Sequence, residues 1–234
     1  MGENAQKSVP AKAGGDFSFG FEGDFVSSYV WRGIVFSDGP ALQPSMWLSL
    51  YGATFSVWGN FVLGDEPNQG RLDEVDFSLS YLFKTKDFFV SPIFLSYLYP
   101  HQDLAATVET SVVLGYQKGP FKIFTAQAVD VVAMTGAYFG LFGGSFEKDL
   151  QSKLTIKTSL GLGWANGIFN EAYFGVPQSK LNLFIWNLEL TWYLRGPLYL
   201  RPHLEVTTLL PASLRESVAD PTVVDGGLAI GVQF

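Results

Sequence analysis

The sequence has no cysteine, only two histidines and few charged residues, and each shortage excludes a class of function. Without cysteine, the chain has no disulfide framework and no thiolate that could act as a nucleophile or metal ligand. His101 and His203 belong to no metal-binding cluster, and neither has a serine at a spacing that would suggest a barrel hydrolase. We therefore predict no enzymatic activity, no metal and no cofactor. The net charge of −7 also argues against nucleic acid as a partner.

Long apolar runs that could form membrane-spanning helices are missing as well. Such a helix needs roughly 20 mostly apolar residues, whereas the uncharged stretches 39–64 and 131–146 are broken by prolines, glycines, Gln43 and Asn60. Aromatic residues nevertheless make up 16% of the chain, as much as all charged residues together. This composition is unusual for a water-soluble protein. No linker rich in Pro, Gly or Ser divides the 234 residues, so one domain is predicted.

Apolar and polar residues alternate in about twelve short segments, most clearly in 75–81. Successive side chains of a strand point to opposite faces, so each segment is predicted to be a strand with one apolar and one polar face. The predicted strands are 16–33, 40–50, 53–63, 71–83, 87–99, 104–117, 120–132, 136–147, 153–165, 180–194, 197–209 and 222–234. This pattern indicates an all-β fold, namely a transmembrane antiparallel up-and-down β-barrel of about 12 strands with its apolar face in lipid.

The predicted connections alternate in length along the chain. Very short turns fall at 51–52, 84–86, 118–119, 148–152 and 195–196, and longer connections at 34–39, 64–70, 100–103, 133–135, 166–179 and 210–221. Short turns at one end and longer loops at the other are the layout of bacterial outer-membrane barrels. Both termini then lie at the short-turn end, in the periplasm. We predict that residues 1–15 are a flexible periplasmic tail and that residues 16–234 form the barrel.

The last predicted strand ends in an aromatic residue preceded by apolar residues at every second position. Leu228, Ile230, Val232 and Phe234 share one face, an arrangement that looks like the sorting signal of outer-membrane barrels. Aromatic residues also flank the short turns, as an interfacial girdle would require. The members of this predicted girdle are Tyr81, Phe83, Phe88, Tyr116, Phe121, Trp192 and Tyr199.

The segment 27–33, with the pattern Tyr-x-Trp-Arg-Gly, is followed by Pro-Ala-x-Gln at 40–43. These two motifs resemble the start of the TorF-like porins, a family of outer-membrane proteins of Gram-negative bacteria. The resemblance implies a barrel and a porin-like role. By their own alternation, Tyr29 and Trp31 share the phase of Phe17 and are predicted to face lipid, with Trp31 anchoring the rim. Arg32 lies in the other phase and is predicted to reach inward to a carboxylate.

The polar phase predicts which side chains line the lumen. They are Glu22, Asp24, Arg32, Asp76, Glu109, Asp130, Lys157, Glu189, Arg201, His203 and Glu205. Charged groups at these depths cannot face hydrocarbon, since Arg or Lys at the bilayer midplane costs about 2–4 kcal/mol. Acids outnumber bases in this set, so an open pore should favour cations.

The densest predicted group lies on the hairpin around Arg195 and Gly196. If Leu194 pairs with Leu198, then Glu189 lies opposite His203, and Asn187 lies opposite Glu205. Cross-strand neighbours lie within about 5 Å, so these side chains and Arg201 could form one network. It is either a station for a cation or solute, with His203 as a pH-sensitive group, or a set of mutually neutralising charges that fill the lumen.

Three functional hypotheses follow from these features. The first is a monomeric, narrow, porin-like channel in the outer membrane for passive diffusion of small cationic or neutral solutes. The second is a plugged barrel with a structural or interaction role and no conduction. The third is a soluble ligand-binding barrel or sandwich. Under the first two, the predicted partners are outer-membrane lipid and the barrel-assembly machinery during insertion, with a small solute as the ligand of the channel.

Overall fold

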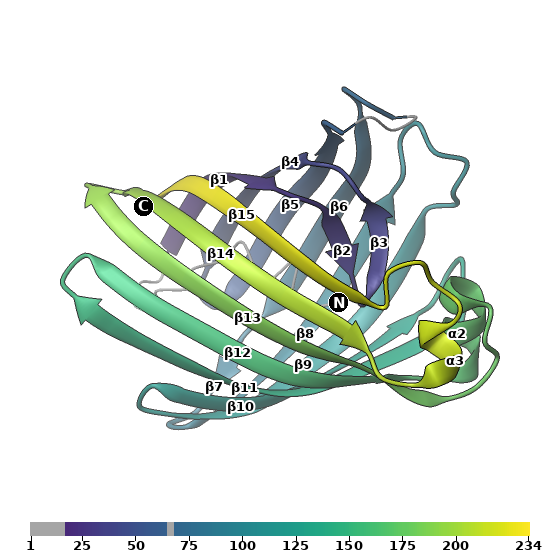
Figure 1. The fold of residues 1–234 in the computed structure, drawn as a ribbon. Helices are drawn as coiled ribbons and strands as arrows, with labels where there is room; N and C mark the ends of the chain where they lie inside the picture. Colours follow the sequence, from purple (N-terminus) through teal and green to yellow (C-terminus); the bar gives the residue numbers. More distant parts are fainter. Residues whose placement is uncertain (1–16, 65–67) are drawn as a thin grey trace.

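The computed structural model describes residues 17–64 and 68–234, which form a closed 12-stranded antiparallel β-barrel (Figure 1). The predicted fold class is confirmed. The strands are β1 (Phe17–Val26), β4 (Ala41–Leu50), β5 (Ala53–Val62), β6 (Leu72–Tyr81) with its continuation β7 (Phe83–Lys84), β8 (Phe88–Leu98), β9 (Thr107–Lys118), β10 (Phe121–Asp130), β11 (Tyr138–Gln151), β12 (Leu154–Ala165), β13 (Lys180–Arg195), β14 (Leu198–Leu209) and β15 (Thr222–Gln233). Consecutive strands pair in order, and β1 pairs with β15 to close the ring.

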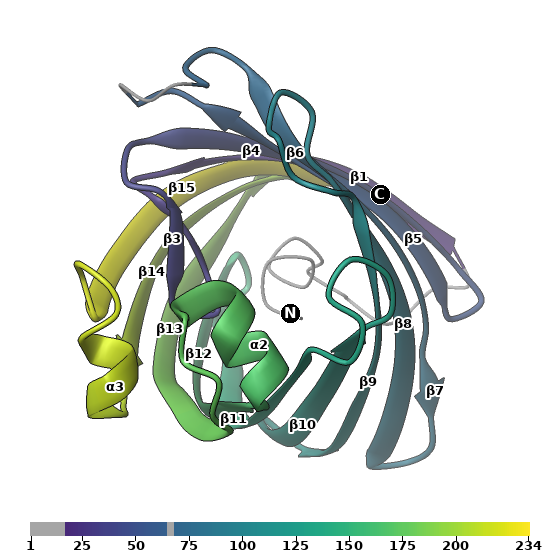
Figure 2. The same cartoon turned by 90° about the vertical axis from the view of Figure 1, so that its right-hand side faces the viewer.

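Four further elements lie at one end of the barrel. β2 (Tyr29–Trp31) and β3 (Ile34–Ser37) form a separate two-stranded sheet, while α2 (Gly167–Phe174) and α3 (Ala212–Arg215) interrupt two of the longer connections. Figure 2, which looks onto this end, shows α2 lying over one side of the barrel opening, near β11 to β13, and β3 running inside the ring of strands. No helix in 17–64 or 68–234 is long and apolar enough to cross a bilayer.

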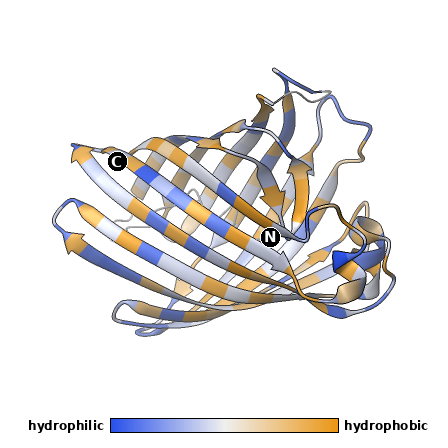
Figure 3. Cartoon of the chain, in the orientation of Figure 1, coloured by the Kyte–Doolittle hydropathy of each residue, from blue (hydrophilic) through white to orange (hydrophobic). Residues whose placement is uncertain are grey.

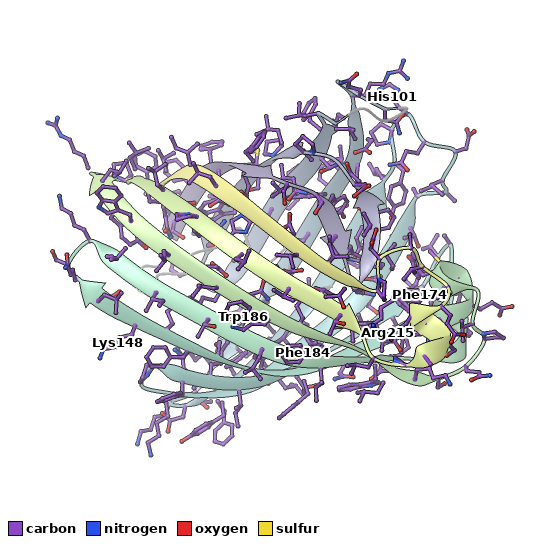
Figure 4. All side chains as sticks on the ribbon, in the orientation of Figure 1. His101, Lys148, Phe174, Phe184, Trp186 and Arg215 are labelled. Atoms are coloured by element: carbon purple, nitrogen blue, oxygen red, sulfur yellow. The ribbon has the colours of Figure 1, made fainter. Side chains whose placement is uncertain are left out.

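The outer surface of the barrel is apolar, and its strands alternate as predicted. Along β4, for example, Met46 and Leu48 are 46% and 45% exposed, whereas Trp47 between them is 3% exposed. Figure 3 shows the alternation as bands of opposite hydropathy along the strands. Figure 4 labels the side chains of Phe184 and Trp186 on β13. A soluble barrel or sandwich would cover such residues with a second layer or replace them with polar ones. The third hypothesis is therefore disfavoured.

The two ends of the barrel differ, and we name them by their connections. At the short-turn end, β4 and β5 are joined through Tyr51 and Gly52, and β13 and β14 through Gly196 and Pro197. The chain also ends here: the Phe234 ring stacks on Phe19 with centroids 4.9 Å apart, and the two backbones exchange hydrogen bonds of 2.9 and 3.1 Å. The opposite, loop end carries β2, β3, α2 and α3.

One predicted strand differs substantially from the structure. The predicted strand 16–33 ends at Val26, and residues 29–37, part of which were predicted as a loop, form the β2–β3 hairpin instead. The longer connections 166–179 and 210–221 contain helices rather than irregular loops. The predicted periplasmic tail, 1–15, lies outside the described residues.

Candidate functional site

A hairpin folded into the lumen is the main feature of the loop end. This inner hairpin, residues 29–37, turns through Arg32 and Gly33, which both have positive φ (51° and 82°). Two central residues with positive φ are the signature of a type I′ turn, in which glycine is favoured because it has no Cβ. At its base, Asp225 on β15 accepts hydrogen bonds from Ser27 Oγ (2.9 Å) and the Ser28 N–H (3.1 Å). The hairpin thus starts at the β1–β15 wall and points inward.

The hairpin tip is fixed to the opposite wall by an ion pair. Arg32 Nη1 and Nη2 donate to the two carboxylate oxygens of Glu109 on β9, at 3.0 and 2.9 Å. Tyr97 Oη on β8 donates to the same carboxylate at 2.7 Å. The Arg32 and Glu109 side chains are 2% and 6% exposed. Bidentate pairing fixes geometry as well as charge, so the hairpin spans the lumen between two anchored ends.

Aromatic side chains surround the tip and close much of the loop end. The Arg32 guanidinium lies over the rings of Trp31 (4.2 Å to the centroid) and Phe139 (4.7 Å). Trp31 also contacts Phe169 of α2, with centroids 6.0 Å apart. Asn166 caps this helix by accepting a hydrogen bond from the Phe169 N–H, a preferred N-cap interaction. Figure 4 labels Phe174, at the other end of α2, at this end of the barrel.

The predicted lipid-facing position of two aromatic residues is therefore wrong. Tyr29 and Trp31 are 3% and 8% exposed and belong to the buried cluster inside the barrel. Tyr199, predicted in the interfacial girdle, is 0% exposed and donates through its hydroxyl to Glu22 at 2.7 Å. Alternation separates the two faces of a strand, but an aromatic ring can occupy either face.

The hairpin leaves little space on one side of the lumen. A cavity of about 40 Å³ lies between it and strands β9 to β14. Its walls are mainly apolar, including Val113, Ala128 and Ile185, with Arg32 and Glu205 among the polar groups. Since a water molecule needs about 10–15 Å³ of such volume, the cavity suits a few water molecules or one small solute.

A second group of charges spans five neighbouring strands further from the loop end, four of which carry one of its residues. Arg201 on β14 pairs with Glu22 on β1 at 2.5 Å and with Glu189 on β13 at 3.1 Å, and Glu189 also pairs with Lys157 on β12 at 2.9 Å. The chain of alternating charges thus runs from β1 to β12. His203 Nε2 lies 2.9 Å from Asp24.

Small residues on β15 allow these contacts, because β15 separates β14 from β1. Its inward positions opposite Tyr199 and His203 are Gly231 and Gly227. A Cβ at either glycine would lie 2.4 Å from the crossing side chain, which no real packing permits. The β14 side chains therefore reach over β15 to the carboxylates of β1.

The predicted hairpin register is correct where it concerns the charged residues. Glu189 pairs with His203 and Asn187 with Glu205, although Arg195, not Leu194, pairs with Leu198 because the register shifts between Tyr193 and Arg195. Of the predicted network, Arg201 and Glu189 are in contact at 3.1 Å, but His203 and Glu205 do not join them. His203 bonds to Asp24 rather than to either glutamate, and Glu205 accepts from Thr207 at 3.2 Å.

The remaining predicted residues differ in their surroundings. Asp76 is 7% exposed, and its Oδ1 has no hydrogen-bond partner among the described residues. Asp130 caps the turn after β10 by accepting from the Val132 and Met134 N–H groups at 2.9 and 3.0 Å, so its role there is structural. Sequence reasoning missed Tyr97 and Asp225 as anchors of the hairpin. The position of Asp225 in the polar phase of the last strand could have marked it as facing the lumen, whereas nothing in the sequence marks Tyr97 in this way.

Buried acids outnumber buried bases among the described residues. The buried carboxylates are those of Glu22, Asp24, Asp73, Glu74, Asp76, Glu109, Asp130, Glu205 and Asp225, against the guanidinium groups of Arg32 and Arg201 alone. Among the same residues, no group of three or more acidic or histidine side chains could hold a metal ion.

No family model matches this chain, and no curated protein matches it. The resemblance to TorF-like porins therefore stays a prediction. Solved structures do match. The NanC porin is 13% identical with a TM-score of 0.57, covering 92% of this chain and 98% of its own. A KdgM porin in complex with disordered oligogalacturonate is 11% identical with a TM-score of 0.51, covering 93% and 98%.

A third match is the translocator domain of the autotransporter NalP from Neisseria meningitidis, 8% identical with a TM-score of 0.53, covering 99% of this chain and 92% of its own. At these identities the similarity concerns the fold alone. The chain has the porin-like 12-stranded barrel fold.

Proposed function

We propose that this protein is a narrow outer-membrane channel through which small cationic or neutral solutes diffuse passively, with its short-turn end and termini in the periplasm. The excess of buried carboxylates carries the proposal, because a wall with this charge attracts cations and repels anions. The apolar outer surface and the porin-like fold support the location. No covalent step is involved, and the protein acts as a monomer.

The inner hairpin is the constriction of the proposed channel. It spans the lumen between Asp225 and Glu109 and leaves a cavity of about 40 Å³ on one side. A solute passing this level must be small or must displace the hairpin. The Arg201 chain of charges contributes less to selectivity, because its members largely neutralise one another.

Planar-bilayer recording of the purified, folded protein tests this function. Under a KCl gradient we expect single-channel events of small conductance and a reversal potential displaced toward that of potassium. A displacement toward chloride would overturn the proposed selectivity, and the absence of events would overturn conduction by the parent protein.

Asp76 is the best single position for testing selectivity, because its Oδ1 has no partner to lose. A cation passing at about 8 Å would lose roughly 0.5–2 kcal/mol of attraction in Asp76→Asn for effective dielectric constants of about 80 to 20. The K⁺/Cl⁻ permeability ratio should then fall about two- to thirtyfold. Asp103→Asn, which removes an exposed charge at the loop end, is the matched control and should leave the ratio nearly unchanged.

The packing of the inner hairpin and α2 against one another favours the plugged barrel as a second candidate. The double variant Arg32→Met/Glu109→Gln separates the two. If the parent is silent and the double variant conducts, the hairpin closes a real channel. If both are silent, the barrel has a structural or interaction role.

A further inference from the structure

Basic residues gather at the short-turn end, although the chain as a whole is acidic. Exposed bases occupy the four turns between β7 and β14 and the strand ends beside them, namely Lys84, Lys86, Lys118, Lys148, Lys153 and Arg195. We call this set the basic rim. Figure 4 labels Lys148 at this end, opposite Phe174 and Arg215. The acids of the same turns and strand ends are fewer: Asp87, Glu147 and Asp149.

The basic rim is not neutralised by the residues that the structure describes. Among the described residues, Lys84, Lys86, Lys118, Lys148 and Arg195 form no ion pair with another side chain. Lys153 donates only to the Leu194 carbonyl, at 3.3 Å. The rim is therefore available to an external anion.

An apolar hollow includes Lys84, the first lysine of the rim, in its lining, and Lys86 lies two residues further along the chain. It has a volume of about 440 Å³ and is lined by Tyr81, Leu82, Phe83, Lys84, Thr85, Phe88, Phe89 and Val90. The β6–β8 ladder ends at the pair Ser80 and Ile93 and resumes at Phe83 and Val90. Pro92, which has no N–H to donate, falls within this gap. On the other side of the strand, the Leu82 N–H donates to the Gly52 carbonyl at 2.8 Å.

The residues around the hollow belong to the apolar outer surface of the barrel. Phe83 and Phe88 are 57% and 63% exposed, and the Phe88 ring contacts Tyr116 with centroids 5.0 Å apart. Exposed aromatic residues beside exposed lysines are typical of the level at which lipid headgroups meet acyl chains. The hollow thus combines an acyl-compatible wall with a cationic edge.

We propose that the hollow and the Lys84–Lys86 part of the basic rim bind an anionic phospholipid of the leaflet at the short-turn end. Its acyl chains lie against Phe83, Phe88 and Val90, and its phosphate contacts Lys84 and Lys86. Clusters of bases attract anionic headgroups with about 1 kcal/mol per Lys or Arg near the surface. This binding does not depend on conduction.

Lipid retention measured by native mass spectrometry tests the site. The full chain is reconstituted in nanodiscs containing equal amounts of phosphatidylglycerol and phosphatidylcholine and then released into mild detergent. We expect the parent protein to retain phosphatidylglycerol preferentially. Lys84→Gln/Lys86→Gln removes two such bases and should reduce the retained ratio by about thirtyfold. Arg71→Gln/Lys180→Gln, which removes two bases from the loop end, is the matched control and should retain the parent ratio.

Equal retention of the two lipids by the parent would overturn the proposal, and so would equal losses in the two double variants. Competition with soluble glycerol phosphate separates a phospholipid from a free anion. If glycerol phosphate at millimolar concentration abolishes the preference, the rim binds phosphate without the apolar hollow, and the phospholipid assignment fails. Persistence of the preference supports it. Bilayer conductance of the same variants should equal that of the parent.

Discussion

Removing either member of the Arg32–Glu109 pair should destabilise the protein more than removing both. Each side chain is almost completely buried, so Arg32→Met leaves an uncompensated carboxylate and Glu109→Gln leaves an uncompensated guanidinium. Breaking a buried pair in this way costs about 3–5 kcal/mol. In Arg32→Met/Glu109→Gln neither charge remains, so the double variant should lose less than either single variant, which corresponds to a coupling free energy above about 3 kcal/mol.

Urea unfolding of the folded protein in lipid bilayers measures these effects. With a slope of about 2 kcal/mol per molar urea, each single variant should lower the midpoint by about 1.5–2.5 M, and the double variant should lower it by less than either single variant. Single-variant losses below about 0.5 kcal/mol that simply add would contradict the assignment of Arg32 and Glu109 as the anchor of the inner hairpin. An unchanged single-channel conductance in the double variant would contradict the hairpin as the constriction.

Two further changes test the packing of the wall. Gly227→Ala places a Cβ 2.4 Å from His203 Nε2 and should lower the free energy of unfolding by about 1–3 kcal/mol. Gly226→Ala, next to it, meets nothing closer than 3.6 Å and should lower it much less. Urea midpoints compare the two variants, and equal midpoints would refute the crossing of β15 by β14 side chains. Leu228→Lys on the outer face of β15 should cost about 2–4 kcal/mol in a bilayer, while Ser159→Lys on the inner face of β12 should cost under about 1 kcal/mol. Reversal of this order would contradict the assignment of the lipid-facing surface.

The barrel and much of its register could be predicted because period-two alternation determines which face each residue occupies. Leu228, Ile230 and Phe234 on the last strand are exposed as expected, at 49%, 53% and 58%. Glu189 and His203 are paired as predicted even though a register shift occurs nearer the turn, because the extra residue lies between Tyr193 and Arg195.

The inner hairpin could not be predicted from the same signal. Phe25, Tyr29 and Trp31 share one phase, with Ser27 as the one polar residue among them, so the pattern is read as a single strand and does not show that the chain leaves the wall after Val26. What redirects the chain is a tertiary contact with Asp225, which is separated from Ser28 by 197 positions. Likewise, the partner of Arg32 could be anticipated as a carboxylate but not as Glu109, since side chains that meet across a lumen have no shared sequence register.

The glycine-lined inner face of β15 has a consequence for how the ring is joined. Tyr199 and Arg201 reach Glu22, and His203 reaches Asp24, so the joint between the first and last strands is bridged by side chains as well as by its own backbone ladder. If the joint closed one residue out of step, Glu22 and Asp24 would turn toward the hydrocarbon and lose all three bridges at once. A misaligned ring would therefore be much less stable than the aligned one, so these side-chain contacts favour closure of the barrel in the correct register.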